Sequence, residues 1–78
     1  MADVRAEFTV EPFAAGAPGA HVDAAIAASR VGGLEPEIGP FATTVVGPPA
    51  TVAEALRAIT DAAFAAGATR ISISVEAV

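Results

Sequence analysis

Strict alternation of apolar and polar residues at both ends of the chain constrains the fold most. From Val4 to Glu11 every second residue is apolar, and the same pattern returns from Arg70 to Val78. A period of two is typical of a strand with one buried face. We therefore predict a strand at each end, whose polar side chains share one face of a sheet: Glu7, Thr9, Glu11, Ser72, Ser74 and Glu76.

Between these two strands the pattern predicts a helix and then a hairpin. The helix is expected from Ala20 to Arg30, where Val22 and Ile26 have helical spacing and Gly32-Gly33 follows as a stop signal. The hairpin is expected from residues 34–38 and 41–46, which are joined by a Gly-Pro turn.

A second helix is expected after Gly47-Pro48-Pro49. The residues Thr51 to Glu54 have the spacing of a capping box, in which a hydroxyl and a carboxylate satisfy free amides at a helix start. Apolar residues then recur with a period of 3.6, and Gly67 is a typical helix end. The apolar residues of the helix are Val52, Leu56, Ile59 and Ala63.

The predicted order is β-α-β-β-α-β, which indicates an α+β, ferredoxin-like fold in a single domain over residues 1–78. Two helices would cover one face of a four-stranded antiparallel sheet, and the other face would stay open, with Thr44 or Thr43 contributed by the third strand. The core is expected to draw on these residues: Phe8, Val10, Ile26, Leu34, Ile38, Val45, Leu56, Ile59, Phe64, Ile71, Ile73 and Val75.

Composition excludes several classes of function. The net charge is −5 and the four arginines are scattered, so a nucleic-acid partner and an anionic membrane surface are not expected. The chain has no cysteine, which excludes thiolate catalysis and Cys-ligated metals.

No apolar run approaches the ~20 residues of a membrane span, and the N-terminal residues are charged where a secretory signal would be apolar. We expect a soluble, cytoplasmic protein whose 78 residues favour self-association as a source of extra burial.

Three functions found on this type of fold can be tested directly. An acylphosphatase needs an arginine in the first loop and an asparagine to orient water, but residues 13–19 hold no arginine and the chain has no asparagine. An RNA-binding sheet needs exposed aromatic residues among basic ones, whereas the exposed strand positions here are acidic or hydroxylic. A metal chaperone of this fold needs a cysteine pair.

The remaining candidates lie on the open face and in the adjoining loops. Phe13 and Phe41 each follow a proline at a strand end. The two rings could stack on both faces of a flat heterocycle, or they could only fill the ends of the core. His21 could contact a ligand, or it could lie at a helix start without a functional role. Glu11 could pair with a cation or be merely solvated. The Thr43-Thr44 pair could donate hydrogen bonds or serve only as good strand formers.

Three segments together resemble the thiamine-binding protein family. They are EFTVEP (Glu7–Pro12), GPFATTVVG (Gly39–Gly47) and AGATR (Ala66–Arg70). The resemblance implies a small, non-catalytic binder of thiamine or of its hydroxymethylpyrimidine moiety, similar to each half of the tandem bacterial binder and assembled as a homodimer or homotetramer through its sheets. It makes Glu11, Thr43 and Thr44 the best site candidates.

We therefore predict a ligand site, with no metal and no cofactor other than the thiamine-type ligand, at the open face and the first loop of a homo-oligomer. Its residues would be Thr9, Glu11, Phe13, His21, Phe41, Thr43 and Thr44. A structural or regulatory oligomerisation module without a ligand is the alternative. An enzyme with His21 as base is a weaker one, because no nucleophile with a base and a stabilising donor is visible in the sequence.

Overall fold

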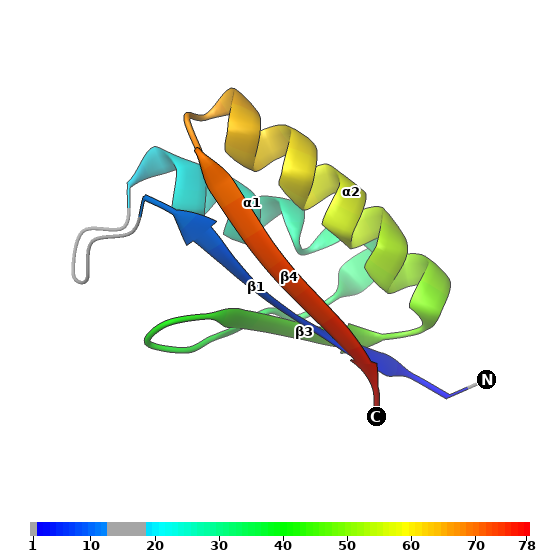
Figure 1. The fold of residues 1–78 in the computed structure, drawn as a ribbon. Coiled ribbons are helices and arrows are strands. Elements are labelled where there is room, and N and C mark those ends of the chain that lie inside the picture. The colour runs from blue at the N-terminus through cyan, green and yellow to red at the C-terminus, as the bar shows by residue number, and fades with distance from the viewer. Residues whose placement is uncertain (1, 13–18) are drawn as a thin grey trace.

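A computed structural model describes residues 2–12 and 19–78 of the chain and confirms the α+β, ferredoxin-like fold. Four antiparallel strands form one sheet in the order β2-β3-β1-β4, and both helices cover the same face (Figure 1). The elements in chain order are β1 (Val4–Glu11), α1 (Ala20–Ala28), the 3-10 turn η1 (Val31–Gly33), β2 (Glu37–Ile38), β3 (Thr43–Gly47), α2 (Pro49–Ala65) and β4 (Arg70–Ala77).

The central strand β1 shows the expected alternation. Ala6, Phe8 and Val10 are buried beneath the helices. On the open face Glu7 lies between Thr44 of β3 and Ser74 of β4. The polar row predicted from the sequence is therefore correct, and the third strand contributes Thr44 to it.

The core consists of two clusters bridged by Leu56 of α2. Alanines let the two helices approach the sheet and one another closely, which is how a chain so rich in alanine fills its interior. The first cluster is Ala6, Leu34, Val45, Val52 and Ala55, and the second is Phe8, Val10, Ala25, Ile59 and Ala63.

Four residues predicted to lie in the core are instead exposed: Ile38, Phe64, Ile73 and Val75. Ile38, Ile73 and Val75 lie on the two edge strands of the sheet, where a side chain has neighbours on one side only. Phe64 projects from α2 away from the buried stripe formed by Ile59 and Ala63. The alternation predicted correctly that Ile38, Ile73 and Val75 lie on the face that carries the helices. They are nevertheless exposed, because the helices of this small two-layer domain do not cover the edges of its sheet.

The hairpin is shorter than predicted. β2 contains only Glu37 and Ile38, because Pro36 has no backbone N–H to donate to a ladder. β3 begins at Thr43 rather than Phe41. The Gly39 N–H donates to the Ala42 carbonyl at 2.9 Å, so Phe41 belongs to the turn and not to the strand.

The helix ends also differ in part. The capping box prediction was wrong: α2 begins at Pro49, with Pro in the favoured first position and no side-chain cap, so Thr51 already lies inside the first turn. The predicted stop at Gly67 is confirmed, because this residue has φ +106° and Ala68 N–H donates back to the Ala63 carbonyl. The first helix ends at Ala28, two residues earlier than expected.

Candidate functional site

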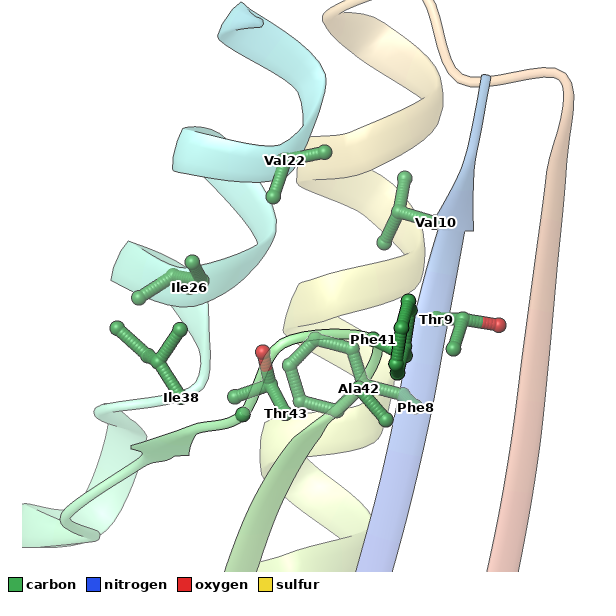
Figure 2. A pocket seen from close by; sticks show the side chains of 10 residues that line it. Phe8, Thr9, Val10, Val22, Ile26, Ile38, Phe41, Ala42 and Thr43 are labelled. Carbon is green, nitrogen blue, oxygen red and sulfur yellow. The ribbon is translucent and has the colours of Figure 1, made fainter. Parts of the chain in front are cut away.

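A cavity of about 160 Å³ lies on the helix-covered side of the sheet, between α1, β1 and the turn that joins β2 to β3 (Figure 2). Its walls are almost entirely apolar. The lining residues are Phe8, Thr9, Val10, Val22, Ile26, Ile38, Gly39, Phe41, Ala42 and Thr43.

Each wall follows from local sequence pattern. The alternation of β1 turns Phe8 and Val10 towards the helices, and the helical spacing of Val22 and Ile26 turns both of them back towards the strand (Figure 2). The β2–β3 turn forms the remaining side. The cavity therefore lies where an alanine-rich helix and a short hairpin leave space between larger side chains.

Thr43 supplies the polar group of the cavity. It is only 6% exposed and pairs with Phe8 in the sheet, so its side chain lies on the helix-covered face. Figure 2 shows its oxygen directed into the space between α1 and β1. Within residues 2–12 and 19–78 this hydroxyl takes part in no hydrogen bond, so it is available to a molecule in the cavity.

Phe41 stands at the entrance. Its side chain is 79% exposed, so it does not plug the core, and it lines the cavity from the turn. Thr9 also borders the cavity, but its side chain points away from it, towards the open face of the sheet (Figure 2). Of the seven residues predicted for the site, Phe41, Thr43 and the main chain of Thr9 are thus brought together.

Two further predicted residues lie near the end of β1 but outside the cavity. The exposed Glu11 carboxylate lies 3.7 Å from Arg70 Nε. His21 Nε2 is hydrogen bonded to the carbonyl of Pro12, which ties the first turn of α1 to the end of β1. Phe13 lies outside the described residues, so the proposed sandwich of Phe13 and Phe41 stays a prediction.

Thr44 lies on the opposite side of the sheet from the cavity. There it borders two polar hollows with Arg5, Glu7 and Glu37. Arg5 donates a hydrogen bond of 2.5 Å to the Glu76 carboxylate, and this bond raises the pKa of the guanidinium above its ordinary value. The open face is therefore polar and carries an ion pair of its own, and its hollows are lined by more polar groups than the cavity.

Sequence reasoning missed the apolar walls. Val22 was assigned only to a helix face, and Ile26 and Ile38 to the core, because periodicity shows which side of an element a residue lies on but not whether the space opposite is filled. The one available signal was Phe41 beside a Gly-Pro turn. Among the described residues no group of three His, Cys, Asp or Glu side chains is placed to hold a metal ion.

The volume and the lining define what the cavity can hold. An engineered apolar cavity of about 150 Å³ binds a single benzene ring, so this one has room for one six-membered ring. Small-molecule sites are typically apolar with few polar groups that fix orientation, and Thr43 can both donate and accept a hydrogen bond.

Comparison with known families identifies what kind of protein carries this cavity. The model of the thiamine-binding protein family matches residues 6–77. The chain belongs to the thiamine-binding protein family. The resemblance seen in the sequence is thereby confirmed over nearly the whole chain. No curated protein matches it.

Solved structures share the fold of this thiamine-binding family member. A domain of unknown function from Bacillus cereus superposes with a TM-score of 0.72 at 26% identity, covering 99% of this chain and 75% of the other. A proposed thiamine biosynthesis or salvage protein from Thermotoga maritima gives 0.69 at 22% identity, covering 96% and 81%. A hypothetical protein from Methanocaldococcus jannascii gives 0.64 at 23%, covering 100% and 80%. The last two, under 25% identical, show a common fold alone.

Proposed function

We propose that this protein binds thiamine or its hydroxymethylpyrimidine moiety without transforming it, and that the pyrimidine ring occupies the cavity between α1, β1 and the β2–β3 turn. The observation that carries this proposal is a ring-sized, apolar cavity with one inward hydroxyl, Thr43, in a member of the thiamine-binding family. The site so proposed lies beneath the sheet rather than on its open face.

The aminopyrimidine suits this lining. Its flat, methyl-bearing ring would pack against Phe8, Val10 and Ile26. The Thr43 hydroxyl could donate a hydrogen bond to a ring nitrogen or accept one from the amino group. Such a hydrogen bond contributes about 0.5–1.5 kcal/mol in net terms. It therefore fixes the orientation of a ligand that the apolar walls hold.

The thiazolium of thiamine is a permanent cation and would not share the cavity. None of the ten lining residues carries a carboxylate, and burying an unpaired charge is costly. At the entrance, however, the exposed ring of Phe41 offers a cation–π contact of about 0.5–1 kcal/mol. We therefore place the pyrimidine inside and the thiazolium outside, over Phe41.

The proposal includes no catalytic step. A threonine nucleophile needs an adjacent base to activate it. The other lining residues are apolar or glycine, except Thr9, whose side chain points away from the cavity. Binding, rather than turnover, is what this set of groups supports.

Isothermal titration calorimetry with four compounds tests the proposal. Hydroxymethylpyrimidine and thiamine should both bind saturably, at about one site per chain, and thiamine diphosphate should bind through the same ring. The isolated hydroxyethylthiazole should not bind, because it lacks the pyrimidine. Absence of heat with both pyrimidine compounds, from folded protein, would contradict the proposal.

A structural or oligomerisation module remains the second candidate, and one observation favours it. The strand β4 lies at the edge of the sheet and exposes Ile73 and Val75, whereas edge strands commonly carry charged residues or proline. We propose that the protein assembles with itself in either case. Folded protein that associates but binds none of the four compounds would leave the module as the function.

A further inference from the structure

The strand β1 continues beyond the point where its neighbour β3 begins. β1 pairs with β4 as far as Glu11, but its register with β3 stops at Phe8, which faces Thr43. In that register the position opposite Val10 is Phe41, which belongs to the β2–β3 turn and not to a strand. The edge of β1 that faces β3 therefore has no neighbouring strand at Val10.

The hydrogen-bond pattern of β1 shows which backbone groups lie on this edge. At one end of the strand the Asp3 carbonyl accepts a hydrogen bond from Val78 N–H. At the other end the Glu11 carbonyl accepts one from Thr69 N–H, so both odd-numbered residues bond towards β4. Because backbone groups alternate in direction along an antiparallel strand, even-numbered residues turn theirs towards β3. The N–H and the C=O of Val10 therefore both lie on the edge that β3 leaves open.

These two backbone groups belong to a buried residue and have no protein partner. Val10 is 5% exposed, and within residues 2–12 and 19–78 neither its N–H nor its C=O takes part in a hydrogen bond. Buried backbone groups are nearly always paired, because an orphan costs as much as a lost hydrogen bond. Val10 also lines the cavity beside the main chain of Thr9 (Figure 2). The cavity thus has a donor and an acceptor side by side on the wall formed by β1, in addition to the Thr43 hydroxyl.

We propose that the N–H and C=O of Val10 select the ligand by recognising the edge of an amino-substituted nitrogen heterocycle. The ring nitrogen next to the amino-bearing carbon accepts a hydrogen bond from Val10 N–H, and the amino group donates one to Val10 C=O. This inference rests on the proposed function and names the part of the ligand that the site recognises. The aminopyrimidine has this edge, whereas the isolated hydroxyethylthiazole has no amino group and cannot form the pair.

A pair of main-chain groups suits an apolar cavity. It supplies two directional polar groups without a charged side chain, and the ladder between β1 and β4 holds both of them in place. A ligand that lacks one of the two complementary groups leaves a buried group of the protein unpaired, and this arrangement discriminates strongly between analogues. We therefore expect selectivity for the amino-substituted edge and not for ring shape alone.

Amide NMR of the full chain bound to isotope-labelled hydroxymethylpyrimidine tests the inference directly. We expect a scalar coupling across the hydrogen bond between the Val10 nitrogen and the ring nitrogen next to the amino-bearing carbon. Hydrogen exchange of the Val10 amide should also become slower when the ligand binds. The Val46 amide is the matched control, because it also lies beyond the end of its neighbouring strand, β2, but outside the cavity lining. Its exchange should not change.

A ligand analogue and a backbone variant test the same hydrogen bond by affinity. Replacing that ring nitrogen with carbon should weaken binding to the native chain by about tenfold or more, because Val10 N–H then stays unpaired. A chemically synthesised chain with an ester in place of Val10 N–H should bind hydroxymethylpyrimidine and the carbon analogue about equally. Its circular dichroism should be native, since this N–H lies outside the β1–β4 ladder.

The outcomes separate this inference from the proposed function. Hydroxymethylpyrimidine that binds without the coupling to Val10 would overturn the inference and leave the proposed function standing. Equal affinities of the native chain for hydroxymethylpyrimidine and its carbon analogue would do the same. Absence of binding to the native, folded chain would overturn the proposed function and this inference with it.

Discussion

Thr43 and Thr44 are neighbours in the chain, but their side chains lie on opposite faces of the sheet. Thr43 pairs with the buried Phe8 and lines the cavity, whereas Thr44 pairs with Glu7 on the open face. The alternation of a strand permits only one of them to reach a ligand in the cavity. Two residues that form a single motif in the sequence therefore have separable roles.

Replacing Thr43 with valine should weaken the binding of hydroxymethylpyrimidine by roughly fivefold. The change keeps the side-chain shape but removes a hydroxyl worth about 1 kcal/mol to a bound ligand. Thr44→Val is the matched control and should bind with native affinity in the same calorimetric titration. Equal losses in the two variants would place the ligand elsewhere.

Phe41→Ala should reduce the affinity for thiamine more than that for hydroxymethylpyrimidine. Only thiamine carries the thiazolium that we place over this ring, and the contact is worth about 0.5–1 kcal/mol. Because Phe41 is so exposed, the free energy of unfolding should change by less than about 0.5 kcal/mol. Phe64→Ala removes another exposed ring outside the cavity lining, so it should change neither affinity.

The sequence was sufficient to predict the fold, because each element carries its own periodicity and the order β-α-β-β-α-β admits few topologies. The site was harder to predict. Thr43 was predicted to be a site residue from the family resemblance and Phe41 from aromatic chemistry at a turn, but their positions relative to Glu11 and His21 depend on the packing of α1, which is a tertiary property. Val22 and Ile26 line the cavity together with residues of the β2–β3 turn, and this neighbourhood of distant segments cannot be predicted from periodicity.

Ile59→Ala should destabilise the protein by about 2–4 kcal/mol, because this side chain is fully buried against β1 and no neighbour can fill the space. Glu54→Ala, on the exposed side of the same helix, should cost less than about 0.5 kcal/mol. Urea unfolding at one protein concentration measures both values. A loss near 1 kcal/mol for Glu54→Ala would instead indicate the capping box that the structure does not contain.

Gly67→Ala should destabilise the protein by about 1–2 kcal/mol. The residue ends α2 with a positive φ, and a Cβ there would meet no neighbour within 4 Å, so the cost lies in the backbone alone. Gly67→Asn should lose clearly less, because asparagine adopts this conformation more readily. Thermal unfolding of the two variants side by side separates backbone strain from packing, and equal losses would contradict this explanation.

The most direct test of the central claim is a methyl NMR titration of the protein with hydroxymethylpyrimidine. We expect the largest shifts at the walls of the cavity, in Val22, Ile26 and Ile38, and little change at Val46, which borders the open face. Saturable shifts confined to the walls would place the pyrimidine where we propose. Saturable shifts at Val46, with the cavity methyls unmoved, would contradict the account and return the ligand to the open face of the sheet.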